Sequence, residues 1–371
     1  MERCGVQAGL ARVAAGLAIL GLVACGQISH LGVVASPTGL TSSPSRGSVA
    51  PTASGTPPSA APLPTPTQFA SVFGTCRLPV MVPHSSGEPP AGWLDVPGGS
   101  YTPDPTTIPV AEKEYGRLSW DPAVGHWVPT DATSISPDGT KYVAQNRPDI
   151  EIVDARTGAT IQRISTTQNG PNYVVAYTSS AVYMGATGKQ PPAGLWKVDT
   201  ASWTLTQISS AAGDWYIADD TAAWGRYTTP TNDVTIKRLD ISTGRVTDTY
   251  KVPSSQDAGV VLAGLVGSGV LLTTFYSGGS GTELGSIGVL YPDGSVVPVD
   301  VPPALQHAGL AKAFQDGRTV LFVAVYPLNW PAVPADPHGW GLAAYDPGHG
   351  LQLLMTHTTP EMVLLGRCMS G

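Results

Sequence analysis

The stretch Ile150-Glu-Ile-Val-Asp154-Ala-Arg-Thr-Gly158-Ala-Thr-Ile161 carries the pattern that decides the fold of this chain. Alternating apolar residues on either side of its centre are typical of β-strands with one buried face. Asp154 is suited to cap a turn with its own side chain, and Gly158 tolerates the positive φ that closes a hairpin. We therefore predict a strand, an Asp-centred turn and a second strand over residues 150–161.

The same unit recurs along the chain. A close copy is Ile236-Lys-Arg-Leu-Asp240-Ile-Ser-Thr-Gly244-Arg-Val246, and weaker copies lie at 118–125, 195–199, 288–294 and 342–350. Another strand, introduced by its own turn, precedes several of the copies. Such a unit of about four strands cannot bury its apolar faces alone, so a closed ring of units is expected.

The run Ser136-Pro137-Asp138-Gly139, followed by the Asp154 to Gly158 hairpin, resembles the TolB-like and WD-repeat-like β-propeller units. The similarity extends over residues 76–371. It implies an all-β propeller, for which the copies favour six blades, with seven as the alternative. The composition agrees, because Gly and Pro are abundant (43 and 35) and strand-forming residues recur without long helical runs.

The N-terminal segment has the features of an export signal. Arg3 and Arg12 accompany an uncharged run from Val13 to Ala24 that is too short to span a bilayer. The run ends in Leu22-Val23-Ala24-Cys25-Gly26, which resembles the bacterial lipobox. We predict a signal peptide over residues 1–24 and lipidation of Cys25, which would hold the protein at the outer face of the bacterial cell membrane. The alternative is an ordinary secretory signal in which Cys25 is incidental.

Residues 25–75 are predicted to form a disordered linker. Between Ala35 and Gln68 the chain is mostly Pro, Ser, Thr, Ala and Gly, and Arg46 is the only charged residue. Such a composition cannot bury a core and stays extended. At about 3.1 Å per residue it could hold the propeller domain, residues 76–371, up to roughly 100 Å from the lipid surface.

Two cysteines remain in the folded part, Cys76 at its start and Cys368 near its end. An exported protein meets an oxidising compartment, so a disulfide between them is favoured over two buried free thiols. The bridge would lock the closure of the ring if one end of the domain completes the blade begun by the other.

Chemistry-bearing motifs are missing from the sequence. There is no Gly-x-Ser-x-Gly elbow, no pair of histidines one helical turn apart and no Cys-x-x-Cys pair. We therefore predict no catalytic residue, metal or cofactor. Only 13% of the residues are charged and the net charge is -7, so nucleic acid is not an expected partner.

The connections between second and third strands are predicted to be long loops on one rim, at 186–194, 226–233, 276–285 and 327–339. Loops on a rigid scaffold are where recognition usually occurs. Exposed indoles and phenols there would suit sugar rings or protein partners. The candidate ligand-binding residues are Arg226, Tyr227, Tyr276, Trp330, Asp336, His338 and Trp340. The alternative is that the tryptophans fill gaps between blades.

Two functions are compatible with these features. The first is a binding or scaffolding module at the cell surface for a protein, a peptide or a cell-wall glycan. The second is an extracytoplasmic lyase or hydrolase acting on polysaccharide or lactone at the mouth of the propeller channel. A propeller assembles such a site from several blades, so the lack of a local motif does not decide between them.

Overall fold

The computed structural model describes residues 75–81, 91–107, 118–146, 149–166, 170–186, 194–229, 231, 233–252, 259–278, 281–306, 308–329, 333–357 and 362–370. The chain divides into two units, Met1–Thr56 and Pro57–Gly371, and every described residue belongs to the second. The predicted signal peptide, Cys25 and nearly all of the predicted linker lie outside the described residues. Within the described part, no helix has the length and apolar character needed to cross a bilayer.

The Asp-centred turns have the predicted geometry. Asp154 Oδ1 accepts hydrogen bonds from the Thr157 amide at 2.8 Å and from its hydroxyl at 2.9 Å, and Gly158 has a φ of 70°. Asp240 accepts the same two bonds from Thr243, each at 2.9 Å. A carboxylate that satisfies the turn's own donors fixes the chain reversal locally, which is why this motif could be found in the sequence.

Five of these turns join the third and fourth strands of antiparallel sheets that we call blades 2 to 6, numbered in chain order. Blade 2 contains β6 (Lys141–Asn146), β7 (Asp149–Asp154) and β8 (Thr160–Ser165), and its inner side is completed by a bridge between Ile135 and Tyr142. Blade 3 contains β9 (Tyr173–Tyr177), β10 (Ala181–Gly185), β11 (Leu195–Asp199) and β12 (Leu205–Ser209). Blade 4 contains β13 (Asp214–Ala218), β14 (Ala222–Thr228), β15 (Val234–Asp240) and β16 (Val246–Lys251).

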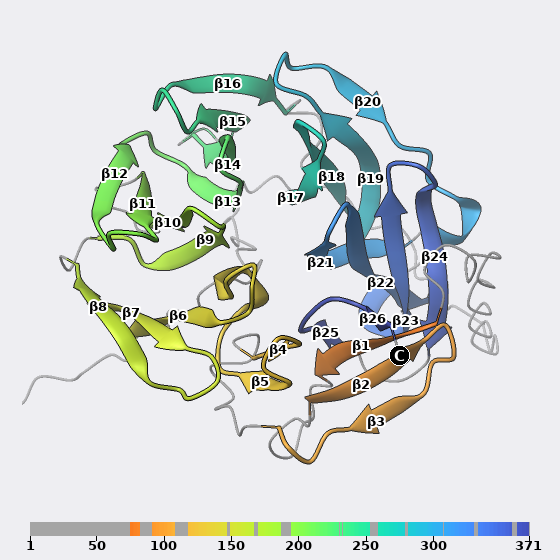
Figure 1. Ribbon diagram of the computed structural model, residues 1–371. Coiled ribbons are helices and arrows are strands. Elements are labelled where there is room, and N and C mark those ends of the chain that lie inside the picture. Colours follow the sequence, from red (N-terminus) through yellow and green to blue (C-terminus); the bar gives the residue numbers. More distant parts are fainter. Residues whose placement is uncertain are drawn as a thin grey trace, which may run out of the picture. The chain divides into compact units, whose positions relative to one another are not determined.

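Blade 5 contains β17 (Val260–Val266), β18 (Gly269–Gly278), β19 (Gly281–Leu290) and β20 (Val296–Pro298). Blade 6 contains β21 (Gly309–Asp316), β22 (Thr319–Asn329), β23 (Val333–Asp346) and β24 (Gly350–His357). In both blades the first strand lies innermost and the fourth outermost (Figure 1). Two short 3-10 helices, Ala132–Ser134 and Pro303–Leu305, precede the Ile135 bridge of blade 2 and the first strand of blade 6, respectively.

Blade 1 is built from both ends of the domain, as predicted. It contains β1 (Cys76–Met81), β2 (Ala91–Val96) and β3 (Tyr101–Pro103), and its inner side is formed by β25 (Val363–Leu364) and β26 (Met369–Ser370), which both pair with β1. The predicted disulfide between Cys76 and Cys368 is present, with the two Cα atoms 5.6 Å apart. The C-terminal segment therefore closes a ring of six blades (Figure 1).

The repeat at 118–125 is not a blade of its own, which corrects the sequence interpretation. It forms a hairpin of β4 (Ser119–Asp121) and β5 (His126–Val128) that pairs with no further named strand among the described residues. Trp127 packs in one cluster with Met81 of blade 1, and Val128 packs in another with Tyr142 of blade 2. The hairpin thus fills the junction between blades 1 and 2, and the sixth blade comes from the two chain ends.

The core lies between the blades rather than at a single centre. Each pair of neighbouring blades from blade 2 to blade 6 shares a cluster of buried apolar residues, and the ring is closed by one in which Leu78 and Leu94 of blade 1 pack with Leu321 and Leu342 of blade 6. Full burial of a large apolar side chain stabilises a fold by about 1.5–3 kcal/mol. Each blade therefore depends on its neighbours for the burial of its apolar faces.

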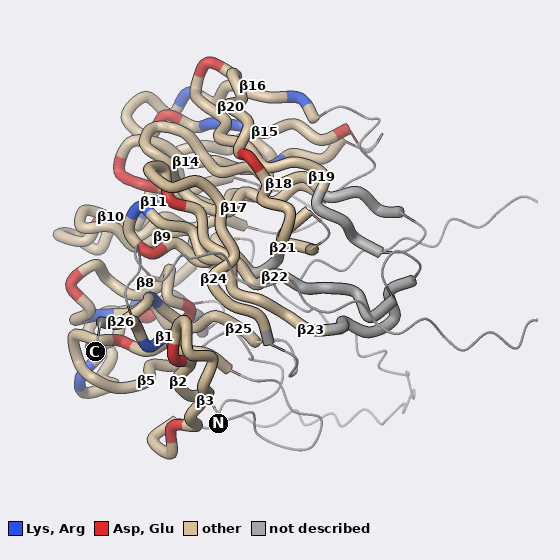
Figure 2. Tube along the Cα trace, turned by 90° about the vertical axis from the view of Figure 1, so that its right-hand side faces the viewer, with Lys and Arg blue, Asp and Glu red and all other residues tan. Residues whose placement is uncertain are grey.

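The strands run alternately up and down, so each blade presents two rims. The turns that join first to second and third to fourth strands lie at one edge, which we call the Asp-turn rim. Many of the Asp and Glu residues gather at turns along the left-hand edge in Figure 2. The connections between second and third strands lie at the opposite edge, which is the rim where the sequence predicts ligand binding.

Candidate functional site

Two of the predicted long loops are mostly strand. β18 and β19 remain paired as far as Gly278 and Gly281, and β22 and β23 remain paired as far as Asn329 and Val333. The glycines and prolines of these segments were interpreted as loop residues. In blade 6 the prolines are accommodated because the pairing shifts register on both sides of Pro327, where ladder hydrogen bonds are not required. These segments are therefore two-stranded extensions of blades 5 and 6.

The predicted site residues on these extensions come from two neighbouring blades. Tyr276 lies in β18, whereas Asp336 and His338 lie in β23 of the next blade. Trp330 lies outside the described residues.

Trp340 is buried, which corrects its assignment as a ligand contact. Only 2% of its surface is exposed, and it belongs to the cluster between blades 6 and 1. The alternation of side chains along β23 places Trp340 on the same face as Leu342, which packs in that cluster. The alternative interpretation of a gap-filling tryptophan is therefore correct for this residue.

Arg226 and Tyr227 are consecutive residues of β14, so their side chains leave opposite faces of blade 4. The Tyr227 ring lies 4.3 Å from Lys237 Nζ of the neighbouring strand. The Arg226 guanidinium lies 5.7 Å from the centre of the Tyr216 ring and donates from Nη1 to the Val260 carbonyl of blade 5 at 3.2 Å. The two predicted residues thus belong to different surroundings, and Arg226 is grouped with a tyrosine that sequence reasoning missed.

Tyr216 is set apart by a β-bulge in β13, the innermost strand of blade 4 (Figure 1). Trp215 pairs with Gly225 and Ile217 pairs with Trp224, so Tyr216 is the extra residue between two regular pairs. Its surface is 43% exposed, whereas Trp215 before it is buried between blades 3 and 4. Bulges re-aim side chains in this way and are frequent beside functional sites. Within the described residues, no strand pairs with the inner edge of β13.

Blade 3 supports the bulge from the other side. The hydroxyl oxygen of Tyr173 in β9 accepts the Trp215 amide at 2.9 Å, directly before the bulged residue. The Tyr173 ring lies over Gly185, where a Cβ atom would come within 2.2 Å of the ring. Gly185 therefore has to be glycine for Tyr173 to reach Trp215.

The pKa values of Tyr216 and Tyr173 are set mainly by burial of their hydroxyl groups. Burial of the hydroxyl raises the pKa of Tyr216, the charge of Arg226 lowers it, and the charge of Asp214 raises it again. Burial also raises the pKa of Tyr173 far above its usual value. Both phenols are therefore neutral hydrogen-bonding groups at physiological pH rather than phenolates.

The group of Asp214, Tyr216 and Arg226 offers an exposed aromatic face with a cation held beside it. A ring of this kind buries a large area on binding at low entropic cost, and a guanidinium adds directional hydrogen bonds. Within the described residues, no three His, Cys, Asp or Glu side chains gather as a metal-ligand set. The arrangement is suited to recognition of a ligand with a flat apolar face and a hydrogen-bond acceptor.

Comparison with known proteins finds likeness only at the level of the fold. No protein-family model matches the sequence, and no curated protein matches it. Solved structures do resemble it, among them TolB from Acinetobacter baumannii, with 15% identity, a TM-score of 0.38, and coverage of 76% of this chain and 69% of that chain. Oligogalacturonate lyase from Vibrio parahaemolyticus has 12% identity, a TM-score of 0.43, and coverage of 76% and 73%.

An oligogalacturonate lyase in complex with manganese is similar to the same degree. Its identity is 14%, its TM-score is 0.44, and the match covers 65% of this chain and 72% of that one. The propeller architecture itself rests on the sheet order and ring closure described above. TolB and oligogalacturonate lyase structures both occur among the structures similar to this chain.

Proposed function

We propose that this protein is a lipid-anchored binding module at the outer face of the bacterial cell membrane. Its propeller takes a protein, peptide or cell-wall glycan ligand at the group formed by Asp214, Tyr216 and Arg226. The Cys25 lipid supplies the membrane contact, and the Pro- and Ser-rich linker supplies the reach.

The observation that carries the proposal is the exposed ring of Tyr216 beside a fixed guanidinium. The bulge presents the ring at 43% exposure, and the Val260 carbonyl of the next blade holds Arg226 in place. Side chains that are fixed before the ligand arrives lose little entropy on binding. Tyrosine and arginine are also the residue types that most often dominate binding energy. Tyr216 and Arg226 are therefore the pair that carries the proposal.

Ligand binding is tested with the full chain purified in detergent, applied to arrays of cell-wall glycans and peptides. Tyr216→Ala and Arg226→Gln should each weaken binding of the ligand found by about tenfold or more. Ile161→Ala is the matched control, because Ile161 is an exposed apolar residue on the outermost strand of blade 2. Equal binding by the wild type and both site variants would place the ligand elsewhere and overturn the assignment.

The anchor is tested separately by intact-mass spectrometry of protein extracted from membranes. The expected N-terminal peptide starts at a diacylglyceryl Cys25. An unmodified Cys25 would overturn the anchor while leaving the binding site open to test. If the ligand found is a polysaccharide, the appearance of shortened chains during incubation would favour the lyase or hydrolase over a binding module.

A further inference from the structure

The charged side chains of the candidate site leave one face of blade 4. Asp214 and Arg226 are directly opposite each other in the pairing of β13 with β14, and directly opposite residues of an antiparallel pair share a face. The hydrogen bond from Arg226 to the Val260 carbonyl shows that this face is turned toward blade 5. Trp215, which stands between Asp214 and Tyr216 in the sequence, is buried on the other side, between blades 3 and 4.

The functional groups of the site meet at the hydroxyl end of Tyr216. This hydroxyl is hydrogen-bonded to the side chains of Asp214 and Arg226, and the charges of both act on it. The guanidinium lies 5.7 Å from the centre of the ring, and 43% of the Tyr216 surface is exposed. A carboxylate and a guanidinium therefore border an open aromatic ring, and a ligand that covers the ring comes within reach of both.

Both charged groups keep capacity for further hydrogen bonds. Within the described residues, the Arg226 guanidinium donates to the Val260 carbonyl and to Tyr216, and the Asp214 carboxylate accepts from Tyr216. A guanidinium has further N–H donors, and an ionised carboxylate has further acceptor positions. The site thus offers a donor and an acceptor side by side at the edge of the ring.

The charges of the site balance each other. An anionic ligand is attracted by Arg226 but repelled by Asp214, and a cationic ligand experiences the reverse. Because the two groups meet at one hydroxyl, their effects on a charged ligand at the ring largely cancel. The arrangement therefore favours an uncharged ligand that can both donate and accept.

We propose that the site takes an uncharged pyranose residue of a glycan, which stacks on Tyr216 while one of its hydroxyl groups donates to Asp214 and accepts from Arg226. This inference rests on the proposed binding function and narrows its ligand to one chemical class.

A pyranose fits this arrangement better than a peptide does. The C–H groups of the sugar form a face that packs on an aromatic ring, and its hydroxyl groups stand at the perimeter of that face. A hydroxyl group donates one hydrogen bond and accepts others, so a single group can satisfy the carboxylate and the guanidinium together. The flat side chains of proline and phenylalanine have no polar group at their edge.

The test measures binding of oligosaccharides to the full chain in detergent by saturation-transfer NMR. The uncharged probes are tetrasaccharides of glucose, of mannose and of N-acetylglucosamine, at concentrations up to about 10 mM. Tetrasaccharides of glucosamine and of glucuronic acid are the cationic and anionic counterparts. At least one uncharged probe should bind more tightly than both charged ones, with the strongest saturation at the C–H protons on one face of a pyranose ring.

Tyr216→Ala should weaken binding of the uncharged probe about tenfold or more, whereas Tyr216→Phe should retain most of it, because the stacking face remains. Asp214→Asn should weaken it about tenfold, since a neutral amide accepts a hydroxyl less strongly than a carboxylate. The same variant leaves Arg226 unbalanced, so it should bind the glucuronic acid probe more tightly than the wild type does. Asp248→Asn is the matched control, because the Asp248 side chain is 70% exposed on the outermost strand of blade 4.

No binding of any uncharged probe, tighter binding of a charged one, or an equal loss in Asp248→Asn would overturn the assignment to an uncharged sugar. A peptide from the arrays whose binding is weakened by Tyr216→Ala, in the absence of sugar binding, would overturn this inference and leave the proposed binding function intact. The proposed function itself fails only if neither Tyr216→Ala nor Arg226→Gln weakens binding of any array ligand.

Discussion

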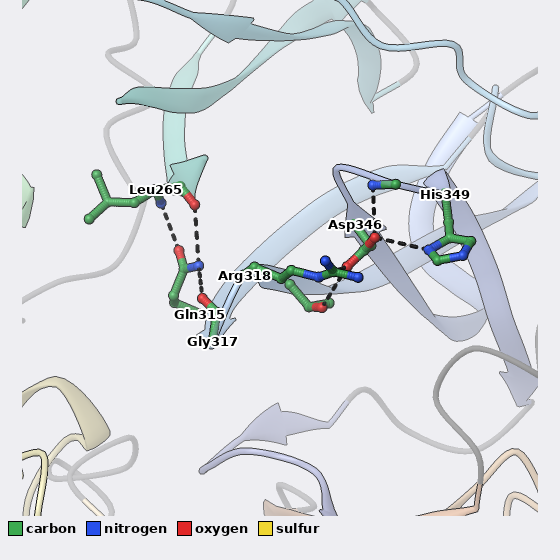
Figure 3. A network of polar contacts seen from close by, with 8 residues as sticks. Leu265, Gln315, Gly317, Arg318, Asp346 and His349 are labelled. Carbon is green, nitrogen blue, oxygen red and sulfur yellow. Dashed lines mark hydrogen bonds and ion pairs between the residues drawn. The ribbon is translucent and has the colours of Figure 1, made fainter. Parts of the chain in front are cut away.

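The side-chain amide of Gln315 in blade 6 pairs with both main-chain polar groups of Leu265 in blade 5. Gln315 Oε1 accepts the Leu265 amide at 2.7 Å, and Nε2 donates to the Leu265 carbonyl at 3.3 Å and to the Gly317 carbonyl at 2.6 Å (Figure 3). A Cβ atom on Gly264 would come within 2.2 Å of Oε1, so glycine makes room for the amide. One side chain thus bridges the innermost strands of two neighbouring blades.

Gln315→Ala is expected to lower the free energy of unfolding by about 1–3 kcal/mol, because it leaves two half-buried main-chain groups without their partner. The measurement is urea denaturation followed by circular dichroism. Gln162→Ala is the control, since within the described residues the Gln162 amide donates only to the adjacent Arg163 carbonyl on an outer strand. Equal losses in the two variants would show that the bridge between blades 5 and 6 contributes nothing specific.

Trp203 occupies the left-handed position that glycine fills in the sister turns. Its φ is 55°, against 70° for Gly158 and 68° for Gly244. The indole packs against the cluster between blades 2 and 3, and this contact offsets the backbone strain. Trp203→Gly and Trp203→Ala lose the same packing, but only glycine relieves the strain.

The glycine variant should therefore be the more stable of the two by about 1 kcal/mol. Their urea midpoints, measured side by side, give this difference without reference to the wild type. An alanine variant as stable as the glycine variant would show that the turn relaxes away from the left-handed conformation.

The local part of the fold could be predicted from the sequence, because each Asp turn satisfies its own hydrogen bonds. The closure by Cys76 and Cys368 could also be predicted, since both cysteines lie at the ends of the folded part. The hairpin at 118–125 was misassigned as a blade because it also contains a local Asp turn. Its turn has the standard geometry, with the Gly125 amide bonded to the Asp121 carbonyl at 2.9 Å, and it differs from a blade in that no further strand pairs with it within the described residues.

The candidate site could be predicted only in part. Arg226 was predicted as a ligand-binding residue because it begins the segment 226–233, which was interpreted as a loop. Tyr216 was missed because its exposure depends on a register shift between β13 and β14, and nothing in the alternation of Asp214 to Ala218 indicates which residue is extra. Other inner strands also shift register against their partners, in blades 3, 5 and 6, so a bulge in the first strand recurs among the blades.

Asp121 should make stability depend on pH. None of its surface is exposed, and Oδ2 has no hydrogen-bond partner within the described residues. Burial raises the pKa of Asp121, although the Ala123 amide and the charges of His126 and Arg367 oppose the shift. Because the pKa of Asp121 is raised above the usual 3.8, its protonated carboxyl group contributes fully to stability below pH 3.8. This contribution is lost as the pH rises through the raised pKa.

Asp121→Asn stays neutral, so it should be more stable than the wild type at pH 7 and gain little at pH 3.5. Thermal unfolding at the two pH values measures the change. Asp154→Asn is the matched control with the opposite sign, because hydrogen bonds from Thr157 lower the pKa of Asp154 and its contribution is present at neutral pH. A gain for Asp121→Asn that is the same at both pH values would rule out titration of this carboxyl group.

The disulfide between Cys76 and Cys368 joins residues separated by 292 positions. In the chain-entropy model, a loop of this length stabilises the folded state by up to about 5 kcal/mol. A reductant should therefore lower the urea midpoint of the wild type substantially. The variant with both cysteines changed to serine should start from the lower midpoint and be insensitive to reductant. A wild-type midpoint that does not respond to reductant would support the alternative of two free thiols.

Tyr173→Phe removes the acceptor of the Trp215 amide while leaving the ring over Gly185. The lost hydrogen bond should lower the free energy of unfolding by about 1 kcal/mol. It should also let the Tyr216 bulge move, so hydrogen exchange at the Trp215 amide should become faster. The ligand identified on the glycan and peptide arrays should then bind more weakly. Tyr177→Phe is the control on the same strand, because the Tyr177 hydroxyl makes no hydrogen bond within the described part of the chain. If exchange at Trp215 is unchanged in Tyr173→Phe, blade 3 does not position the candidate site, and the bulge is maintained by blade 4 alone.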